Sequence, residues 1–194
     1  PRFEKASAAN KATDRLGCRS ALRNALRPAG SFKRARASLA YTWTYGFASR
    51  RSTRSYTDQP VTREQLYEII RLGTMAPSGM NNQPWRFLYA LRNTPHWETF
   101  FNLLTPSNQV WCRNAAALLV VISKTTFDFN NKPARTHSYD AGAAWYSFAL
   151  QGTMMGLVVH GMQGFNYDRA KEELGVPDGY QVEAMAAVGR PGDA

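Results

Sequence analysis

The spacing of apolar residues predicts four helices after residue 60. Thr62 and Gln65 form a capping box, in which a Thr side chain and a Gln three residues later satisfy the unpaired N–H groups at a helix start. Apolar residues follow at helical spacing and predict a helix over 63–75. Similar patterns predict three more helices, over 97–104, 138–157 and 168–174. Pro106 closes the first of these. The helix over 138–157 is the longest, and it holds Asp140 in its first turn, where a negative charge suits the helix dipole.

Three segments between these helices are typical of strands. The alternation over 85–89 indicates a half-buried strand, the continuous apolar run 115–123 a fully buried one, and 181–189 a final strand. Residues 124–137 are polar and predict a loop, and 161–165 a tight segment bounded by glycine. Strands and helices do not alternate regularly, which favours the α+β class over a doubly wound sheet.

Charge divides the chain at about residue 54. The 194 residues carry 24 Lys and Arg against 14 Asp and Glu, a formal net charge of +10. Thirteen basic and two acidic residues lie in 1–54, so the remainder holds 11 basic and 12 acidic residues and is nearly neutral. Residues 1–40 are rich in Ala, Ser and Arg and predict a disordered basic leader before a domain at 41–194. A transit peptide, a nucleic-acid-binding arm and extraneous upstream sequence remain alternatives for the leader.

Composition excludes several other classes. No apolar run reaches the ~18 residues of a membrane helix. Cys18 and Cys112 are too few for a disulfide framework, so we expect free thiols and a cytoplasmic location, unless the leader directs import into an organelle. The three histidines lack metal-ligand spacing, and the serine-hydrolase, Walker and dinucleotide-binding motifs are absent, so we expect no metal and nominate no catalytic acid or base. The chain begins at Pro1 and stops soon after its last predicted strand, and we expect the natural protein to continue at both ends.

Two short motifs carry the candidate chemistry. Arg50-Arg51-Ser52-Thr53-Arg54 offers guanidinium forks, which bind phosphate through paired hydrogen bonds, although a solvated charge run is an alternative. Ala76-Pro77-Ser78-Gly79-Met80-Asn81-Asn82-Gln83-Pro84-Trp85 places amide side chains in a turn before a strand. Amides bind the polar edge of a heterocycle, although an ordinary Pro/Gly/Asn turn is again the alternative.

The two motifs in this order resemble the opening of the FMN-dependent nitroreductase family. The resemblance extends over about residues 48–194. The later features follow in the family's order: Asn108 and Trp111 before the apolar strand, the helix start at 140–144, the segment 160–165 and Gly189-Arg190-Pro191. It implies a nitroreductase-like α+β fold, with a central, mostly antiparallel sheet flanked by helices and a domain completed by homodimerisation. Two FMN molecules would lie at the subunit interface.

The resemblance also implies roles for residues of the arginine motif and of the segment after the longest helix. Arg50, Arg51 and Ser52 would hold the FMN phosphate and ribityl chain. Arg54 would reach the pyrimidine end of the flavin, where a cation stabilises the charge of the reduced ring. Two residues would lie where the backbone approaches flavin N5: Gln163 and Gly164.

Further flavin contacts are implied for the second motif and for the residue before Trp111. Three residues would meet the flavin from the partner subunit: Pro77, Ser78 and Gly79. Three amide side chains are candidate partners for the ring edge or ribityl chain: Asn81, Gln83 and Asn108. The resemblance also implies that the longest helix forms the core of the dimer interface. Four of its side chains would supply apolar area there, or would alternatively pack inside their own subunit: Trp145, Phe148, Met154 and Met155.

The implied activity is a ping-pong transfer of a hydride. NADH or NADPH would reduce the flavin, and a nitroaromatic, quinone or similar small acceptor would then oxidise it. Two alternatives remain: a specialised flavoenzyme of the same fold (a dehalogenase, an azoline oxidase or a flavin-cleaving enzyme), or a nucleic-acid-binding protein that uses the basic arm. Nucleic-acid binding would fall steeply with salt and would be lost on deleting residues 1–40.

Three features depart from the family pattern. Residues 40–49 hold many aromatic and β-branched residues and a glycine, so the helix that normally precedes the arginine motif is not expected. The family usually continues past the last strand with a segment that carries another phosphate-binding basic residue, whereas the given sequence stops at residue 194, which bears on FMN affinity and dimer stability. Trp111 stands where some relatives have a flavin-contacting lysine, which would alter substrate preference.

Overall fold

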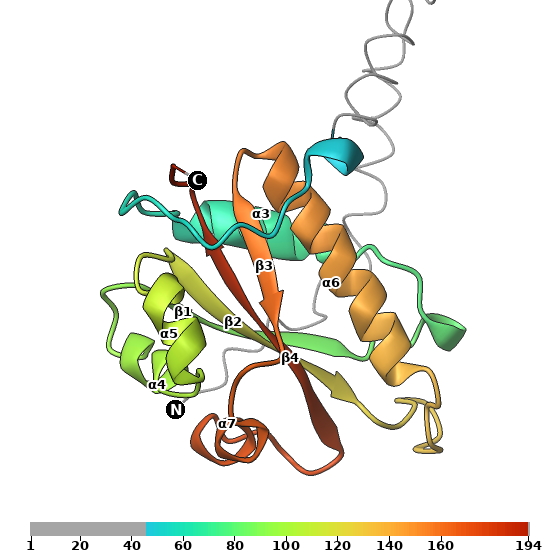
Figure 1. Ribbon diagram of the computed structural model, residues 1–194. Coiled ribbons are helices and arrows are strands. Elements are labelled where there is room, and N and C mark those ends of the chain that lie inside the picture. The colour runs from blue at the N-terminus through green and yellow to red at the C-terminus, as the bar shows by residue number, and fades with distance from the viewer. Residues whose placement is uncertain (1–45, 194) are drawn as a thin grey trace, which may run out of the picture. The chain divides into compact units, whose positions relative to one another are not determined.

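A computed structural model describes residues 46–193 of the protein. The predicted leader 1–40, Cys18 and most of the segment 40–49 lie outside the described residues. Within the described part, helices pack on both faces of one sheet (Figure 1). None of the described helices is long and apolar enough to cross a membrane.

The sheet has the strand order β1-β2-β4-β3, and every neighbouring pair is antiparallel. Its strands are β1 (Trp85–Leu91), β2 (Ala117–Lys124), β4 (Tyr180–Gly189) and β3 (Val158–Met162). The second strand in this order, β2, is buried from Ala117 to Ser123 because it is paired on both sides and covered on both faces. The predicted α+β class and the mostly antiparallel sheet are therefore confirmed.

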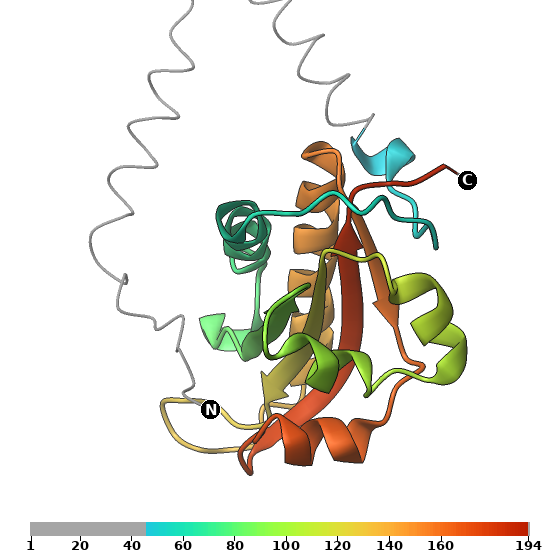
Figure 2. The same cartoon turned by 90° about the vertical axis from the view of Figure 1, so that its left-hand side faces the viewer.

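Two groups of helices cover the two faces of the sheet (Figures 1 and 2). On one face, α3 (Arg63–Gly73) and α6 (His137–Met154) pack their apolar side chains on the sheet. On the other face lie α4 (Trp97–Phe101), α5 (Pro106–Cys112) and α7 (Tyr167–Glu173). A short 3-10 helix, η1 (Gly79–Asn81), precedes β1. The capping box predicted at the start of α3 is present, with both reciprocal hydrogen bonds.

The structure corrects several predicted boundaries. The longest helix ends at Met154, because Gly156, with a φ of 72°, turns the chain into a strand that was not predicted, β3. The helix expected over 97–104 ends at Phe101. Pro106, expected to close that helix, instead stands in the first turn of another, where its missing N–H has no helical partner to lose. Residues 46–49 are helical, although a helix over 40–49 was not expected.

The crossing of α3 and α6 depends on a glycine. A Cβ at Gly73 would lie 2.8 Å from Cβ of Phe148 and 3.0 Å from the carbonyl oxygen of Ala144. Phe148 is fully buried, so neither it nor the helix backbone can move away freely. The two helices therefore approach closely only because Gly73 has no side chain.

Replacing this glycine tests the crossing. We expect Gly73→Ala to lower the free energy of unfolding by about 1–3 kcal/mol through overpacking. Gly142→Ala is the matched control, because this α6 glycine has no atom within 4 Å of its ideal Cβ. The free energy of unfolding of this control should equal that of the wild type or exceed it by up to about 1 kcal/mol, because alanine has a higher helix propensity than glycine. Urea denaturation measures both, and a Gly73→Ala variant as stable as the control would contradict this packing.

Candidate functional site

The arginine motif is held between the sheet and the end of the chain. The carbonyl oxygen of Thr53 lies 2.9 Å from Nδ1 of His160 on β3. Farther along, Thr57 N–H donates to the carbonyl of Arg190, and Gly192 N–H donates to the carbonyl of Ser55. The motif therefore runs beside β3, one of the two edge strands of the sheet, and the segment after β4 fixes it there.

Trp111 of α5 joins the arginine motif to the sheet. The Arg54 guanidinium carbon lies 6.0 Å from the centre of the Trp111 ring, within reach of a cation–π interaction. The centre of the Trp111 ring also lies 4.5 Å from the centre of the His160 ring and 6.2 Å from that of the Tyr56 ring. Trp111, which the sequence analysis gave both as part of the family resemblance and as a departure from the family pattern, is thus the centre of an aromatic cluster that places Arg54.

The cluster continues to the loop between β3 and α7. The carbonyl of Gly164 accepts hydrogen bonds from Asn108 Nδ2 at 2.9 Å, from Thr105 N–H at 3.0 Å and from Thr105 Oγ1 at 3.1 Å. Asn108 Oδ1 in turn accepts from Trp111 Nε1 at 3.2 Å. A Cβ at Gly164 would lie 2.6 Å from Asn108 Nδ2, so a larger residue would displace the Asn108 amide from this hydrogen bond. Its neighbour Gln163 is exposed.

The structure thus brings together one part of the predicted site. The arginine motif, Asn108 and Gly164 are far apart in the sequence, and they meet around Trp111 and His160. Within the motif, the Arg50 guanidinium donates to Ser52 Oγ at 3.2 Å. Arg51 is exposed and donates to the carbonyls of Ala48 and Arg50, which leaves other guanidinium N–H groups available to an anion.

The second motif is organised around buried Asp140. Asp140 Oδ2 accepts from the backbone N–H of Gly79 at 3.0 Å and from Thr136 Oγ1 at 3.2 Å. Inside the turn, Ser78 Oγ accepts from the N–H of Gln83 at 2.9 Å. The sequence suggested for Asp140 only a favourable position in the helix dipole, whereas its carboxylate also anchors the turn. That contact joins residues 61 positions apart and has no local sequence signal.

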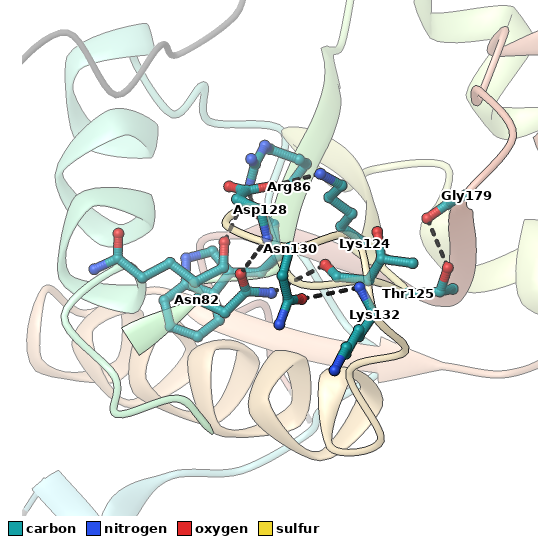
Figure 3. A network of polar contacts seen from close by, with 11 residues as sticks. Asn82, Arg86, Lys124, Thr125, Asp128, Asn130, Lys132 and Gly179 are labelled. Carbon is teal, nitrogen blue, oxygen red and sulfur yellow. Dashed lines mark hydrogen bonds and ion pairs between the residues drawn. The ribbon is translucent and has the colours of Figure 1, made fainter. Parts of the chain in front are cut away.

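Asn82, which the sequence analysis did not select, ties this turn to the loop after β2 (Figure 3). Its Nδ2 donates to the carbonyl of Thr126 at 3.2 Å, and its Oδ1 accepts from the N–H of Asp128 at 3.0 Å. An ion pair between Asp128 and Lys124 holds the same loop. Asn81 is exposed and Gln83 is partly buried, and a 3.3 Å hydrogen bond joins their amides.

The two motifs are not linked to each other within the described part of one chain. The short helix that leads into the arginine motif contacts the C-terminal end of α6, since the nearest atoms to a Cβ at Gly46 belong to Met154 and Leu150. The second motif contacts the other end of α6 through Asp140. Within residues 46–193, no hydrogen bond or ion pair links Arg50–Arg54 to Pro77–Gln83.

A pocket of about 470 Å³ lies between the first half of α6 and the ends of β3 and β4. Gln163 lines it, and so do Trp145 and Glu183, which sequence reasoning did not select for a site. Trp145 packs tightly on Gly161, where a Cβ would lie 2.6 Å from the indole ring. Its Nε1 is buried and makes no hydrogen bond within the described part of the chain.

The four apolar side chains that were predicted for the longest helix divide between the two alternatives. Phe148 is fully buried in its own subunit, against Phe87 of β1. Met154 is 44% exposed, and Trp145 and Met155 are partly buried. Packing inside the subunit therefore accounts for Phe148, while Met154 leaves apolar area for another contact.

Comparison with known proteins identifies the family. A model of the Nitroreductase family matches residues 47–190, which is most of the chain. The chain belongs to the nitroreductase family. The resemblance predicted from the two motifs and the fold class that it implied are thereby confirmed.

Individual relatives agree with this family membership. A crystal structure titled as an oxidoreductase containing FMN is 43% identical, has a TM-score of 0.74 and matches 77% of each chain. A protein of Archaeoglobus fulgidus named "Putative NADH dehydrogenase/NAD(P)H nitroreductase" is 25% identical over 75% of this chain and 83% of its own. An uncharacterised 15.4 kDa protein of Mycolicibacterium smegmatis is 35% identical over half of this chain, and the matched part spans 65% of that protein.

The residue that follows Trp111 in this family member is a buried thiol, that of Cys112. Cys112, at the end of α5, has no exposed surface, and its Sγ lies 3.6 Å from Sδ of Met162. Burial raises the pKa of the Cys112 thiol to about 12, and burial together with the neighbouring thiol also raises the pKa of Tyr56. Both side chains are therefore held in their neutral forms in the folded protein.

This thiol predicts a loss of stability in alkali. The unfolded thiol ionises with a pKa near 9.0 while the folded thiol stays neutral, so its contribution is complete below pH 9 and is lost as the pH rises toward 12. We expect the free energy of unfolding to fall by about 1.4 kcal/mol between pH 8 and pH 10 because of Cys112. Urea denaturation at the two pH values measures the drop. In Cys112→Ala the drop should shrink by that amount, and equal drops in both proteins would refute the assignment.

Proposed function

We propose that the protein is an FMN-dependent oxidoreductase that moves a hydride from NADH or NADPH to a small oxidised acceptor by a ping-pong mechanism. The observation that carries the proposal is the assembly of the arginine motif with Asn108 and Gly164 around Trp111. Membership of the nitroreductase family and the relatives whose names and titles mention FMN and NAD(P)H support it. Nitroaromatic compounds, quinones and similar molecules are the proposed acceptors.

The residues present suit FMN. Three guanidinium groups lie within five positions, at Arg50, Arg51 and Arg54, and provide charged donors for a phosphate. Close by, the hydroxyl oxygen of Thr53 is buried without a hydrogen-bond partner among the described residues, which suits a polar ligand beside the motif. At Gly164, hydrogen bonds from Asn108 and Thr105 fix the backbone that would lie beside the ring.

Each group of residues has a proposed task toward the cofactor. Bound FMN would supply the two-electron chemistry that links the nicotinamide to the acceptor. Arg50, Arg51 and Ser52 would hold its phosphate and ribityl chain. Arg54, placed by the Trp111 ring, would hold a positive charge near the pyrimidine end. Asn108 orients the backbone at Gly164 that would lie near N5, with Gln163 beside it.

A second copy of the chain would complete the site. The turn that holds Pro77, Ser78, Gly79, Asn81 and Gln83 lies away from the arginine motif of its own subunit. In a homodimer, the partner's copy of this turn would reach the flavin. Exposed aromatic and methionine side chains near α6 offer an apolar surface for that contact: Phe47 at 52%, Met154 at 44% and Tyr146 at 39% exposure.

Flavin absorbance gives the first test. The purified protein, or the protein after addition of FMN, should absorb at ~450 nm and lose this absorbance when NADH or NADPH is added without oxygen. A subsequent addition of a quinone or nitroaromatic compound should restore it. A protein that gains no flavin absorbance with added FMN would refute the proposed function.

The phosphate contact gives a second prediction. Arg51→Ala should weaken FMN binding by about ten- to a hundredfold, because a charged hydrogen bond contributes about 1.5–3 kcal/mol. Quenching of FMN fluorescence on binding measures the dissociation constant. Arg71→Ala on α3 is the matched control, since Arg71 pairs with Glu68 on the surface and should leave FMN binding unchanged. Equal dissociation constants for the two variants would remove Arg51 from the site.

A further inference from the structure

The pocket beside Gln163 has one charged residue in its wall. Its walls combine an apolar floor, including Val121, Met162 and Ala184, with the side chain of Glu183 on β4. An engineered apolar cavity of about 150 Å³ accepts benzene. A pocket of about 470 Å³ is therefore large enough for one aromatic ring with substituents.

A polar network fixes the carboxylate of Glu183. Its Oε1 accepts hydrogen bonds from Ser138 Oγ at 2.8 Å and from Ser123 Oγ, and it lies 3.4 Å from His137 Nδ1. Ser123 is fully buried and also contacts His137 Nδ1 at 2.7 Å. These contacts therefore hold the carboxylate in one position at the pocket wall.

The second oxygen of this carboxylate remains available. Every hydrogen bond to Glu183 within the described residues goes to Oε1, so Oε2 has no protein donor there. The charge also acts on its surroundings, because burial and the Glu183 charge raise the pKa of the Tyr167 phenol. A carboxylate oxygen without a donor, next to an apolar floor, favours a ligand that brings its own donor or positive charge.

We propose that this pocket receives the oxidised acceptor and that Glu183 selects acceptors with a cationic or hydrogen-bond-donating substituent on an aromatic ring. The inference rests on the proposed function, since Gln163 joins the pocket to the segment proposed to lie near flavin N5. The ring occupies the apolar floor beside Trp145, and the substituent reaches Oε2 of Glu183. Acceptors with a carboxylate in the same position are disfavoured by like charge.

Two nitroaromatic probes of opposite charge test the selection. The dissociation constants of 4-nitrobenzylamine and 4-nitrobenzoate are measured on the oxidised, FMN-loaded enzyme without NAD(P)H, from the change that each causes in flavin absorbance. We expect the amine to bind at least tenfold more tightly than the acid. In Glu183→Gln, which keeps the shape of the side chain, this ratio should fall to within about twofold of one.

Two further variants separate charge from structure. Ser138→Ala removes one hydrogen bond to the carboxylate but leaves its charge, so the preference for the amine should persist. Glu172→Gln on α7 is the matched control for loss of a carboxylate, since Glu172 does not line this pocket, and the wild-type ratio should remain. A purely structural role of Glu183 would change the binding of both probes alike, whereas the proposal requires their ratio to change.

A structural readout does not depend on the variants. In crystals of the wild-type, FMN-loaded enzyme soaked with 4-nitrobenzylamine, the ammonium group should lie within hydrogen-bond distance of Glu183. Equal binding of the two probes to the wild type, an unchanged ratio in Glu183→Gln or an ammonium group elsewhere would overturn the inference. An enzyme that holds flavin and oxidises NAD(P)H but shows one of these results fails this inference alone, whereas absence of bound flavin fails the proposed function.

Discussion

The fold and the candidate site are joined at one backbone carbonyl, that of Gly164. Three donors from Thr105 and Asn108 converge on it, and they hold the end of β3 against the start of α5. Through Asn108 the same contact fixes Trp111, and Trp111 in turn places Arg54. A Cβ at Gly164 would meet the ends of these same Asn108 and Thr105 side chains, so a larger residue would have to displace the donors. The position of the candidate flavin-binding residues therefore depends on this set of hydrogen bonds.

Local patterns predicted the elements whose signals lie within a few residues. The capping box predicted the start of α3, and the continuous apolar run predicted β2, because both signals depend only on residues that are close in the sequence. By contrast, β3 was missed because Val158–Met162 is short, contains His160 and Gly161, and becomes a strand through pairing with β4. The start of α5 was missed because Pro106 suits both the end of one helix and the first turn of the next.

The residues of the candidate site also differ in whether a local sequence pattern marks them. The two motifs were visible because their residues are contiguous, and the family resemblance supplied Asn108, Gln163 and Gly164. The anchors Asp140 and Asn82 and the pocket carboxylate of Glu183 act through partners that are 44 to 61 residues away, so no local pattern marks them. Sequence reasoning thus found residues proposed to touch the cofactor, and the structure added the residues that position them.

The central claim is that each flavin site is built from two copies of the chain. Mixed dimers test it directly: one copy carries Arg51→Ala and Arg54→Ala, the other carries Gly79→Trp, and the two have different affinity tags. Neither homodimer should hold FMN tightly, while the purified mixed dimer should regain one intact site and bind one FMN per two chains. Mixed dimers as empty as the parents, or a Gly79→Trp homodimer with full flavin content, would contradict it.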